Sequence, residues 1–172
     1  MRIAYTRPDG GVSIVNAAPK EQLARVLRFP VVDDEGKIIG DRGPTDAEYR
    51  AHVIERAVPK DATDVVEMAV DAVLPERAFR DAWVLKGRSI DHDMAKARAI
   101  HRAKIREARA PLLAQLDVEY QRADERSDTA GKAGIAARKQ KLRDATSDPA
   151  IDAATTVDDL KAAWPAELGV DR

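Results

Sequence analysis

The sequence predicts an α+β fold, in which a small antiparallel β-rich N-terminal part precedes a long helical hairpin and a short C-terminal helix. Over residues 1–90, β-branched residues alternate with Gly- and Pro-containing turns, which is typical of short strands joined by hairpins. Residues 91–165 are instead rich in Ala, Arg, Lys and Glu, with apolar residues at helical spacing. Aromatic residues make up only 4% of the chain and charged residues 34%, which favours solvated helices with narrow apolar stripes over a thick core.

Two β-hairpins are predicted in the N-terminal part. In the first, residues 2–6 and 12–15 form short strands around residues 7–11, where a proline presets φ and two glycines supply positive φ. In the second, residues 30–32 and 37–39 flank an Asp-Asp-Glu-Gly turn. Both patterns indicate antiparallel pairing between strands that are neighbours in the sequence.

The other N-terminal elements are predicted to be short. Residues 20–27 are long enough for two helical turns. Thr45, with Glu48 three residues later, forms a capping box for a helix that ends near Ala57. Residues 64–73 alternate only loosely, so we interpret them as a strand and keep a helix as the alternative.

Residues 91–128 are predicted to form a long helix that begins at Asp93 or Asp91. Pro111 lies inside it and lacks a backbone donor, so it is expected to bend the helix or divide it in two. The residues expected on the apolar face follow a helical spacing and are Met94, Ala97, His101, Ile105, Ala108, Leu112, Leu116 and Ala123.

Two further helices complete the prediction. Residues 130–145 form the second arm of the hairpin, after a cap at residues 127–129 and with Ile135 and Leu142 turned inward. A short helix then runs from about Thr156 to Trp164, before a proline. The expected organisation has three parts. Residues 1–90 form a β-rich part with one or two short helices, residues 91–165 form the helical hairpin with its terminal helix, and residues 166–172 form a frayed tail.

Composition limits the possible functions. The net charge of −1 argues against a general nucleic-acid binder or a polybasic membrane-surface protein. The absence of cysteine excludes disulfides, Cys-ligated zinc and thiol chemistry. The N-terminal residues lack the apolar run of a signal peptide, and no stretch approaches the ~20 apolar residues of a membrane span. We therefore expect a soluble protein made in a cytoplasm, with neither membrane nor nucleic acid as partner.

Charge is distributed unevenly along the C-terminal part. Residues 92–145 carry 13 basic and 8 acidic side chains, whereas residues 146–172 carry 2 basic and 6 acidic ones. We expect the acidic segment to pack back on the helices, with a partner-binding patch as the alternative.

No pattern in the chain predicts catalysis. Its histidines are His52, His92 and His101, and the last two are nine residues apart, which places them on different faces of a helix. No phosphate-binding loop and no Gly-x-Ser-x-Gly elbow is present, although a pair of acidic residues among the many carboxylates stays open as an alternative. We predict no catalytic residue, no metal site and no cofactor, and interpret His101 as a hydrogen-bonded core residue.

Two clusters of side chains suggest binding. The first is a stripe of arginines on the long helix, which we interpret as a solvated face, with an RNA-binding ridge as the alternative: Arg98, Arg102, Arg106 and Arg109. The second is Phe79 and Trp83 with Arg80, which either form a core seam against the long helix, the favoured interpretation, or anchor a partner. Tyr120 and Trp164 have the same two interpretations.

Several blocks of the sequence recur in a known order, and they are residues 1–12, 76–83, 93–102, 109–117, 139–144 and 159–165. Together they resemble small phage and prophage proteins from tail and tail-fibre regions, and residues 92–165 also resemble tail-fibre assembly proteins. The blocks carry packing and capping patterns and no catalytic residues.

The resemblance implies a non-enzymatic structural protein of a bacteriophage tail, at its tip, fibre or spike attachment. Such a protein binds other tail or tail-fibre proteins, and a homo-oligomer is a further option. Its location would be the virion tail. The alternative is a tail-fibre assembly chaperone that acts in the host cytoplasm and is not retained in the particle. A small nucleic-acid-binding regulator or an enzyme is a third hypothesis from a different class.

Overall fold

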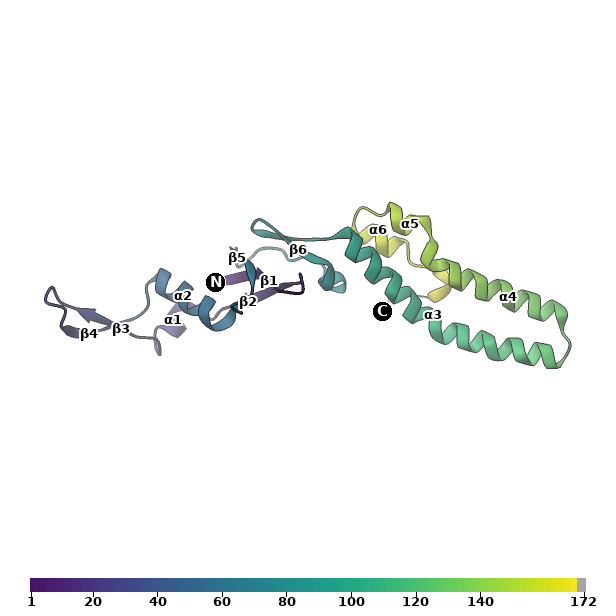
Figure 1. Cartoon of the computed structure of the whole chain (residues 1–172), viewed down its shortest axis with the longest axis horizontal. Helices are drawn as coiled ribbons and strands as arrows, with labels where there is room; N and C mark the ends of the chain where they lie inside the picture. The colour runs from purple at the N-terminus through teal and green to yellow at the C-terminus, as the bar shows by residue number, and fades with distance from the viewer. Residues whose placement is uncertain (170–172) are drawn as a thin grey trace. The chain divides into compact units, whose positions relative to one another are not determined.

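The computed structural model describes residues 1–169 (Figure 1). The chain divides into two compact units, Met1–Asp91 and His92–Arg172. The first contains all the β-strands apart from the last residue of one hairpin, and the second is helical. The predicted α+β class, with small antiparallel strands before a long helix, is confirmed.

The N-terminal unit is built on a three-stranded antiparallel sheet. Its strands are β1 (Arg2–Thr6), β2 (Val12–Asn16) and β5 (Thr63–Met68), in the order β2-β1-β5. The first predicted hairpin is therefore correct, and its turn closes with a 2.7 Å bond from the Arg7 amide to the Gly11 carbonyl. The segment at residues 64–73 is a strand rather than a helix, although it ends at Met68.

Both faces of this sheet are covered, because successive residues of a strand point to opposite sides. On one face Ile3 and Tyr5 pack with α2 (Asp46–Ala57), through Tyr49 and Val53. On the other face Ala4 belongs to a second buried cluster, which also contains Val12, Met68, Trp83 and Ile90. The core of this unit thus consists of two thin apolar layers on either side of one sheet.

The helix α2 begins as its sequence predicts. Thr45 and Glu48 form the reciprocal capping box, and Arg42 adds a two-pronged ion pair with the Glu48 carboxylate, at 2.6 and 2.8 Å. The hydrogen bonds from Arg42, and then that from the Thr45 amide, lower the pKa of Glu48 from 4.5 to about 2. This contact joins the start of α2 to the end of the preceding strand.

The helix α1 (Lys20–Leu23) is shorter than the two α-helical turns predicted for residues 20–27. Backbone bonds continue one more turn, to the Leu27 amide, without extending the α-helix. No side chain caps the start of α1, and none of its residues is buried, so nothing stabilises a longer helix.

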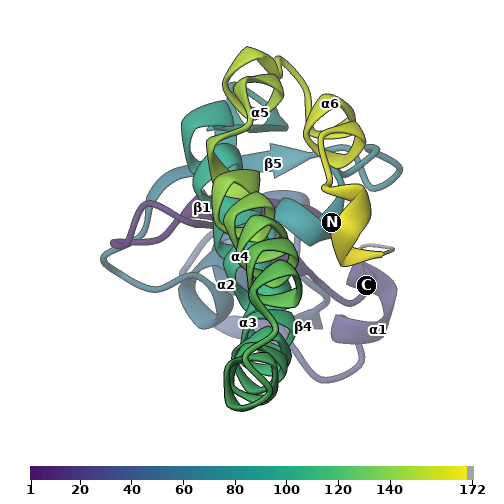
Figure 2. The same cartoon turned by 90° about the vertical axis from the view of Figure 1, so that its right-hand side faces the viewer.

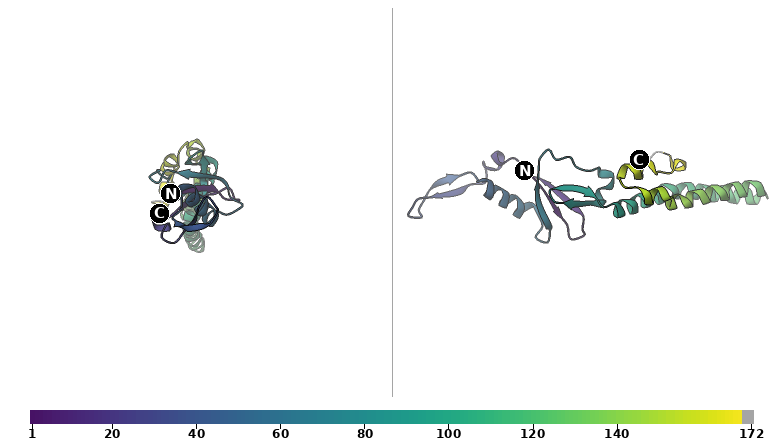
Figure 3. Two further views of the ribbon diagram at one scale, coloured as in Figure 1. Left: turned by 90° about the vertical axis from the view of Figure 1, so that its left-hand side faces the viewer. Right: turned by 90° about the horizontal axis from the view of Figure 1, so that it is seen from above.

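The second predicted hairpin is also correct and forms an arm, which we define as residues 29–42. It consists of β3 (Phe29–Val32) and β4 (Ile38–Arg42), paired only with each other among the described residues. The Asp33 carboxylate accepts hydrogen bonds from the amides of Glu35 and Lys37 and so fixes the turn. The arm extends past α2, away from the three-stranded sheet (Figure 3).

A third hairpin was not predicted. After the 3₁₀ turn η1 (Arg77–Ala82), β6 (Trp83–Lys86) pairs with β7 (Ser89–His92). Gly87 occupies its two-residue loop with a φ of 61°, a value that favours glycine. The signal was present in the sequence as a glycine between two β-prone runs.

The C-terminal unit is a helical hairpin of α3 (Met94–Glu125) and α4 (Thr129–Asp144), capped by the side chains of Asp93 and Asp128. The prediction that Pro111 divides the long helix is wrong, because α3 continues through it for 32 residues. The buried residues Ile105 and Leu116 lie on either side of Pro111, and their packing holds both halves of the helix on one stripe. A bend at Pro111 stays a prediction.

The residues that follow α4 fold back on the hairpin (Figures 1 and 2). They form η2 (Ala145–Ser147), α5 (Pro149–Ala153), α6 (Val157–Ala162) and η3 (Ala166–Leu168). Ile151, Ala154 and Leu160 are buried, so the acidic segment packs back as predicted. The helix α5 was not predicted, although Asp148 caps it and Pro149 follows at the start of the helix, a pattern that favours a helix N-terminus.

The stripe predicted on α3 is buried at Ala97, His101, Ile105, Leu116 and Ala123 and half-buried at its other positions. Of the tail predicted for residues 166–172, the last three residues lie outside the described part of the chain.

Among residues 1–169, no helix combines the length and the apolar character that crossing a membrane requires.

Candidate functional site

The structure does not assemble the five predicted anchor residues into one site. In the N-terminal unit, Phe79 is fully buried and Trp83 is 3% exposed, while Arg80 between them is exposed. Trp83 lies in the cluster with Ala4 and Met68, and its Nε1–H donates to the Glu76 carbonyl at 3.2 Å. Trp83 is thus a core residue, as favoured, and its cluster belongs to the N-terminal unit. The seam of Phe79 and Trp83 against the long helix stays a prediction.

The other two predicted anchors lie in the C-terminal unit. The ring of Tyr120 is 38% exposed and has the Lys139 ammonium 5.6 Å from its centre. Trp164 is half-buried, donates from Nε1 to the Gly169 carbonyl at 2.8 Å, and meets the buried His101 ring edge-on at 5.7 Å. Tyr120 is about 28 Å farther along α3 than His101, at 1.5 Å per residue. The two aromatics therefore belong to different surfaces.

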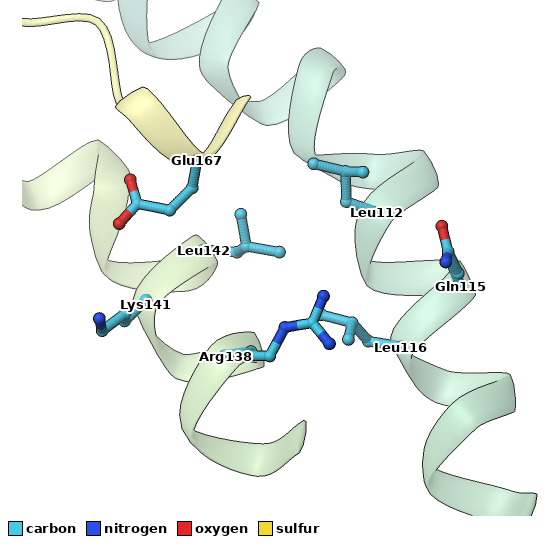
Figure 4. Close-up of a pocket in the computed structure, with 7 residues that line it drawn as sticks. All are labelled: Leu112, Gln115, Leu116, Arg138, Lys141, Leu142 and Glu167. Atoms are coloured by element: carbon cyan, nitrogen blue, oxygen red, sulfur yellow. The ribbon is translucent and has the colours of Figure 1, made fainter. Parts of the chain in front are cut away.

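A hollow of about 300 Å³ lies between α3, α4 and η3 (Figure 4). Its apolar lining is Leu112 and Leu116 from α3 and Leu142 from α4, and Figure 4 shows Leu112 and Leu142 directed toward each other across the space. Leu116 and Leu142 are 3% and 5% exposed, so they also belong to the packed seam of the hairpin. The polar lining consists of Gln115, Arg138, Lys141 and Glu167.

The rim is partly ordered by a short polar network. The Gln115 amide donates to Glu119 Oε1 at 2.9 Å, and Arg138 Nη1 lies 3.5 Å from Glu119 Oε2. The Arg138 side chain is 65% exposed, and its guanidinium extends toward Leu116 (Figure 4). A cation is thereby held above an apolar floor.

A second and more open hollow of about 710 Å³ adjoins the first, because Lys141 and Glu167 line both. It runs along residues 144–150 and 162–167 and includes Trp164 among its walls. We call the two hollows together the hairpin groove. Of the predicted anchors in this unit, Trp164 borders the groove.

The wall of the groove is fixed in place by the arginines of α3. Arg109 donates to the carbonyls of Leu142 and Arg143, at 3.0 and 2.7 Å, in the last turn of α4. These carbonyls have no partner within their own helix, and a guanidinium supplies one.

Two more arginines hold the segment that follows. Arg102 donates to the Thr146 carbonyl at 3.1 Å and forms a 2.7 Å ion pair with Asp152, and Arg98 donates to the Ala154 carbonyl at 2.9 Å. The interpretation of this stripe as a solvated face is therefore wrong for three of its four members. Arg106 is the exposed member.

The histidines of the described residues lie apart from one another in the chain. His101 is buried in the C-terminal unit and is therefore a core residue, as predicted, while the hydrogen bond expected of its ring stays a prediction. His52 and His92 are half-buried. Within residues 1–169, no group of three His, Cys, Asp or Glu side chains is close enough together to hold a metal ion.

The chemistry that the groove offers is recognition. Its floor accepts an apolar side chain. The charged groups that line the 300 Å³ hollow are Arg138, Lys141 and Glu167, so its rim is net positive and favours an acidic neighbour of that side chain. Sequence reasoning placed these leucines in the core and did not identify Arg138 or Lys141. Arg138 and Lys141 are three residues apart and so lie on the same side of α4, and this spacing was the signal in the sequence that could have identified them. Comparison with protein-family models, curated proteins and solved structures finds no match.

Proposed function

We propose that this chain is a non-enzymatic structural protein of a bacteriophage tail, and that the hairpin groove is where it binds another tail or tail-fibre protein. The phage assignment rests on the sequence resemblance. The binding assignment rests on one observation, a hollow of about 300 Å³ whose floor is the half-buried Leu112 with the buried Leu116 and Leu142, below a charged rim.

The partner that fits this groove is a segment with a large apolar side chain next to an acidic one. A volume of about 300 Å³ lies at the small end of ligand pockets and suits one inserted side chain. The cation that faces such a segment is Arg138, whose guanidinium extends into the space between the helices (Figure 4), and Lys141 adds positive charge at the outer border of the hollow. Because the rim is solvent-exposed, these charges contribute more to specificity and association rate than to affinity.

The arginine contacts support a binding role because they make the groove rigid before a partner arrives. Arg98, Arg102 and Arg109 attach the C-terminal segment to α3 at three separate backbone carbonyls. A preformed surface loses less conformational entropy on binding than one that must order itself.

Mass spectrometry of purified phage particles tests the tail assignment. Presence at a fixed ratio to known tail proteins supports a structural component that stays in the virion. Absence from particles, together with co-purification with a fibre protein from infected cells, supports the assembly chaperone instead. Absence from both contradicts either form of the proposal.

Charge reversal at the rim tests the groove. The double variant Arg138→Glu and Lys141→Glu should lose about tenfold or more of its binding to the co-purified tail protein, while its melting temperature stays near that of the parent. The matched control is Arg106→Glu, an exposed arginine on α3 that does not line the groove. Equal binding by the rim variant and the control would show that the partner binds elsewhere.

A further inference from the structure

We propose that the arm, residues 29–42, pairs with the arm of a second copy of this chain through its β4 strand, so that two hairpins form one four-stranded antiparallel sheet. This inference goes beyond the proposed function, because it concerns self-association through the N-terminal unit and does not depend on the hairpin groove.

The arm has one strand edge that is open to pairing. Its sheet contains β3 and β4 alone, so each strand has one neighbour among the described residues. On β3, Pro30 has no backbone N–H and therefore disfavours the addition of another strand at that edge. β4 contains no proline, and all five of its residues are exposed. The β4 edge can therefore add a strand, and the β3 edge is protected against it.

The side chains of the arm are more apolar than a solvated hairpin requires. Val32 and Ile38 lie opposite each other across the two strands, yet they are 54% and 67% exposed. Ile39 is 62% exposed and lies at the irregularity of the ladder, between the paired positions Ile38 and Gly40. An isolated two-stranded sheet is marginal in water, whereas more strands with a shared apolar face are stable.

The distribution of charge along the arm selects a second copy as the partner. The turn at the tip carries the exposed acids Asp34 and Glu35. At the base, Arg28 and Arg42 are paired with Asp41 and Glu48, and the remaining cation is the exposed Arg25, whose neighbour Ala24 is close to Gly43, the residue after the arm. Among residues 1–169, neither these two acids nor Arg25 forms an ion pair.

In such a dimer a two-fold axis relates the two β4 strands, which therefore pair antiparallel. The acidic tip of each arm then lies beside the base of the other arm, where Arg25 is located, and the isoleucines lie between the two ends. Such an interface is self-complementary, as an isologous dimer requires.

Sedimentation analysis of the full chain over a range of concentrations tests the proposal. We expect a reversible monomer–dimer equilibrium. Ile39→Lys should weaken it about tenfold or more, because lysine on an edge strand opposes edge-to-edge pairing. The matched control is Val73→Lys, which places the same charge at a side chain that is 94% exposed outside the arm. A chain that stays monomeric at all concentrations, or a dimer that Ile39→Lys does not weaken, would overturn the proposal.

Two further measurements keep the test independent of folding defects in that variant. Glu35→Arg and Arg25→Glu should each weaken the dimer, and the double variant should restore it, because the charges are then exchanged between tip and base. In addition, the chain has no cysteine, so single-cysteine variants carry one thiol each. Oxidation should link Ile39→Cys into a covalent dimer faster than Val73→Cys, and equal rates would contradict pairing at β4.

Discussion

Arg109 on α3 donates a 3.0 Å hydrogen bond to the backbone carbonyl of Leu142, in the last turn of α4. The same nitrogen also reaches the carbonyl of Arg143, at 2.7 Å. One side chain of the first helix thereby caps the second helix, next to the leucine that forms part of the groove floor. The stability of the hairpin and the shape of the candidate site therefore depend on the same contact.

Replacing Arg109 by alanine should destabilise the C-terminal unit by about 1.5–3 kcal/mol, since it removes two charge-assisted hydrogen bonds and leaves the Arg143 carbonyl only the 3.4 Å bond from the Thr146 hydroxyl. Urea unfolding followed by circular dichroism measures this change. Arg106→Ala is the matched control, because Arg106 is exposed on the same helix. If the two variants unfolded at the same urea concentration, the Arg109 contact would contribute nothing to stability.

Glu48 should make the stability of the N-terminal unit depend on acid pH. Its pKa is about 2 in the folded chain against an ordinary 4.5, chiefly because Arg42 hydrogen-bonds its carboxylate. A lowered folded pKa stabilises the fold fully above about pH 4.5, and this contribution is lost as the pH falls toward 2. Thermal unfolding between pH 6 and pH 2 should therefore show a smaller loss for Glu48→Gln than for the parent. Parallel curves would mean that the ion pair does not form in solution.

Trp83→Ala should cost about 3–5 kcal/mol, because it removes a large buried side chain from the cluster with Ala4 and Met68. The variant should melt early or express poorly, since a domain has only ~5–15 kcal/mol in total. Arg80→Ala, at a neighbouring exposed position, should leave the melting temperature nearly unchanged. An unchanged melting temperature for Trp83→Ala would contradict its assignment to the core.

Pro111→Ala should stabilise the chain. Proline inside a helix removes one backbone hydrogen bond and crowds the carbonyl of Glu107, at a cost of up to ~3 kcal/mol relative to alanine. Greater freedom of the unfolded chain offsets about 1 kcal/mol of this gain. Pro111 is exposed, so its ring contributes little packing. The midpoint of urea unfolding should rise, and a fall would indicate that the long helix needs the geometry that proline imposes.

The sequence by itself determined the local elements and their starting points. The caps at Thr45, Asp93, Asp128 and Thr156 all follow from residues within three positions of one another. A hydrogen bond between near neighbours is decided by the local chain, whatever the rest of the molecule does. The α+β class could be predicted for the same reason. The turns of the first two hairpins and the change in composition near residue 90 are local features of the sequence.

Only the tertiary structure decided which distant residues the side chains of α3 contact. Arg98 and Arg109 look like a solvated stripe in the sequence, but their acceptors lie 56 and 33 residues away, at helix ends that only folding brings beside α3. The groove has the same origin, since Leu112 and Leu142 meet across two helices. Pro111 is tolerated because packing on either side outweighs a local preference. Each of these outcomes depends on free energy shared between distant segments, which a pattern along one segment does not contain.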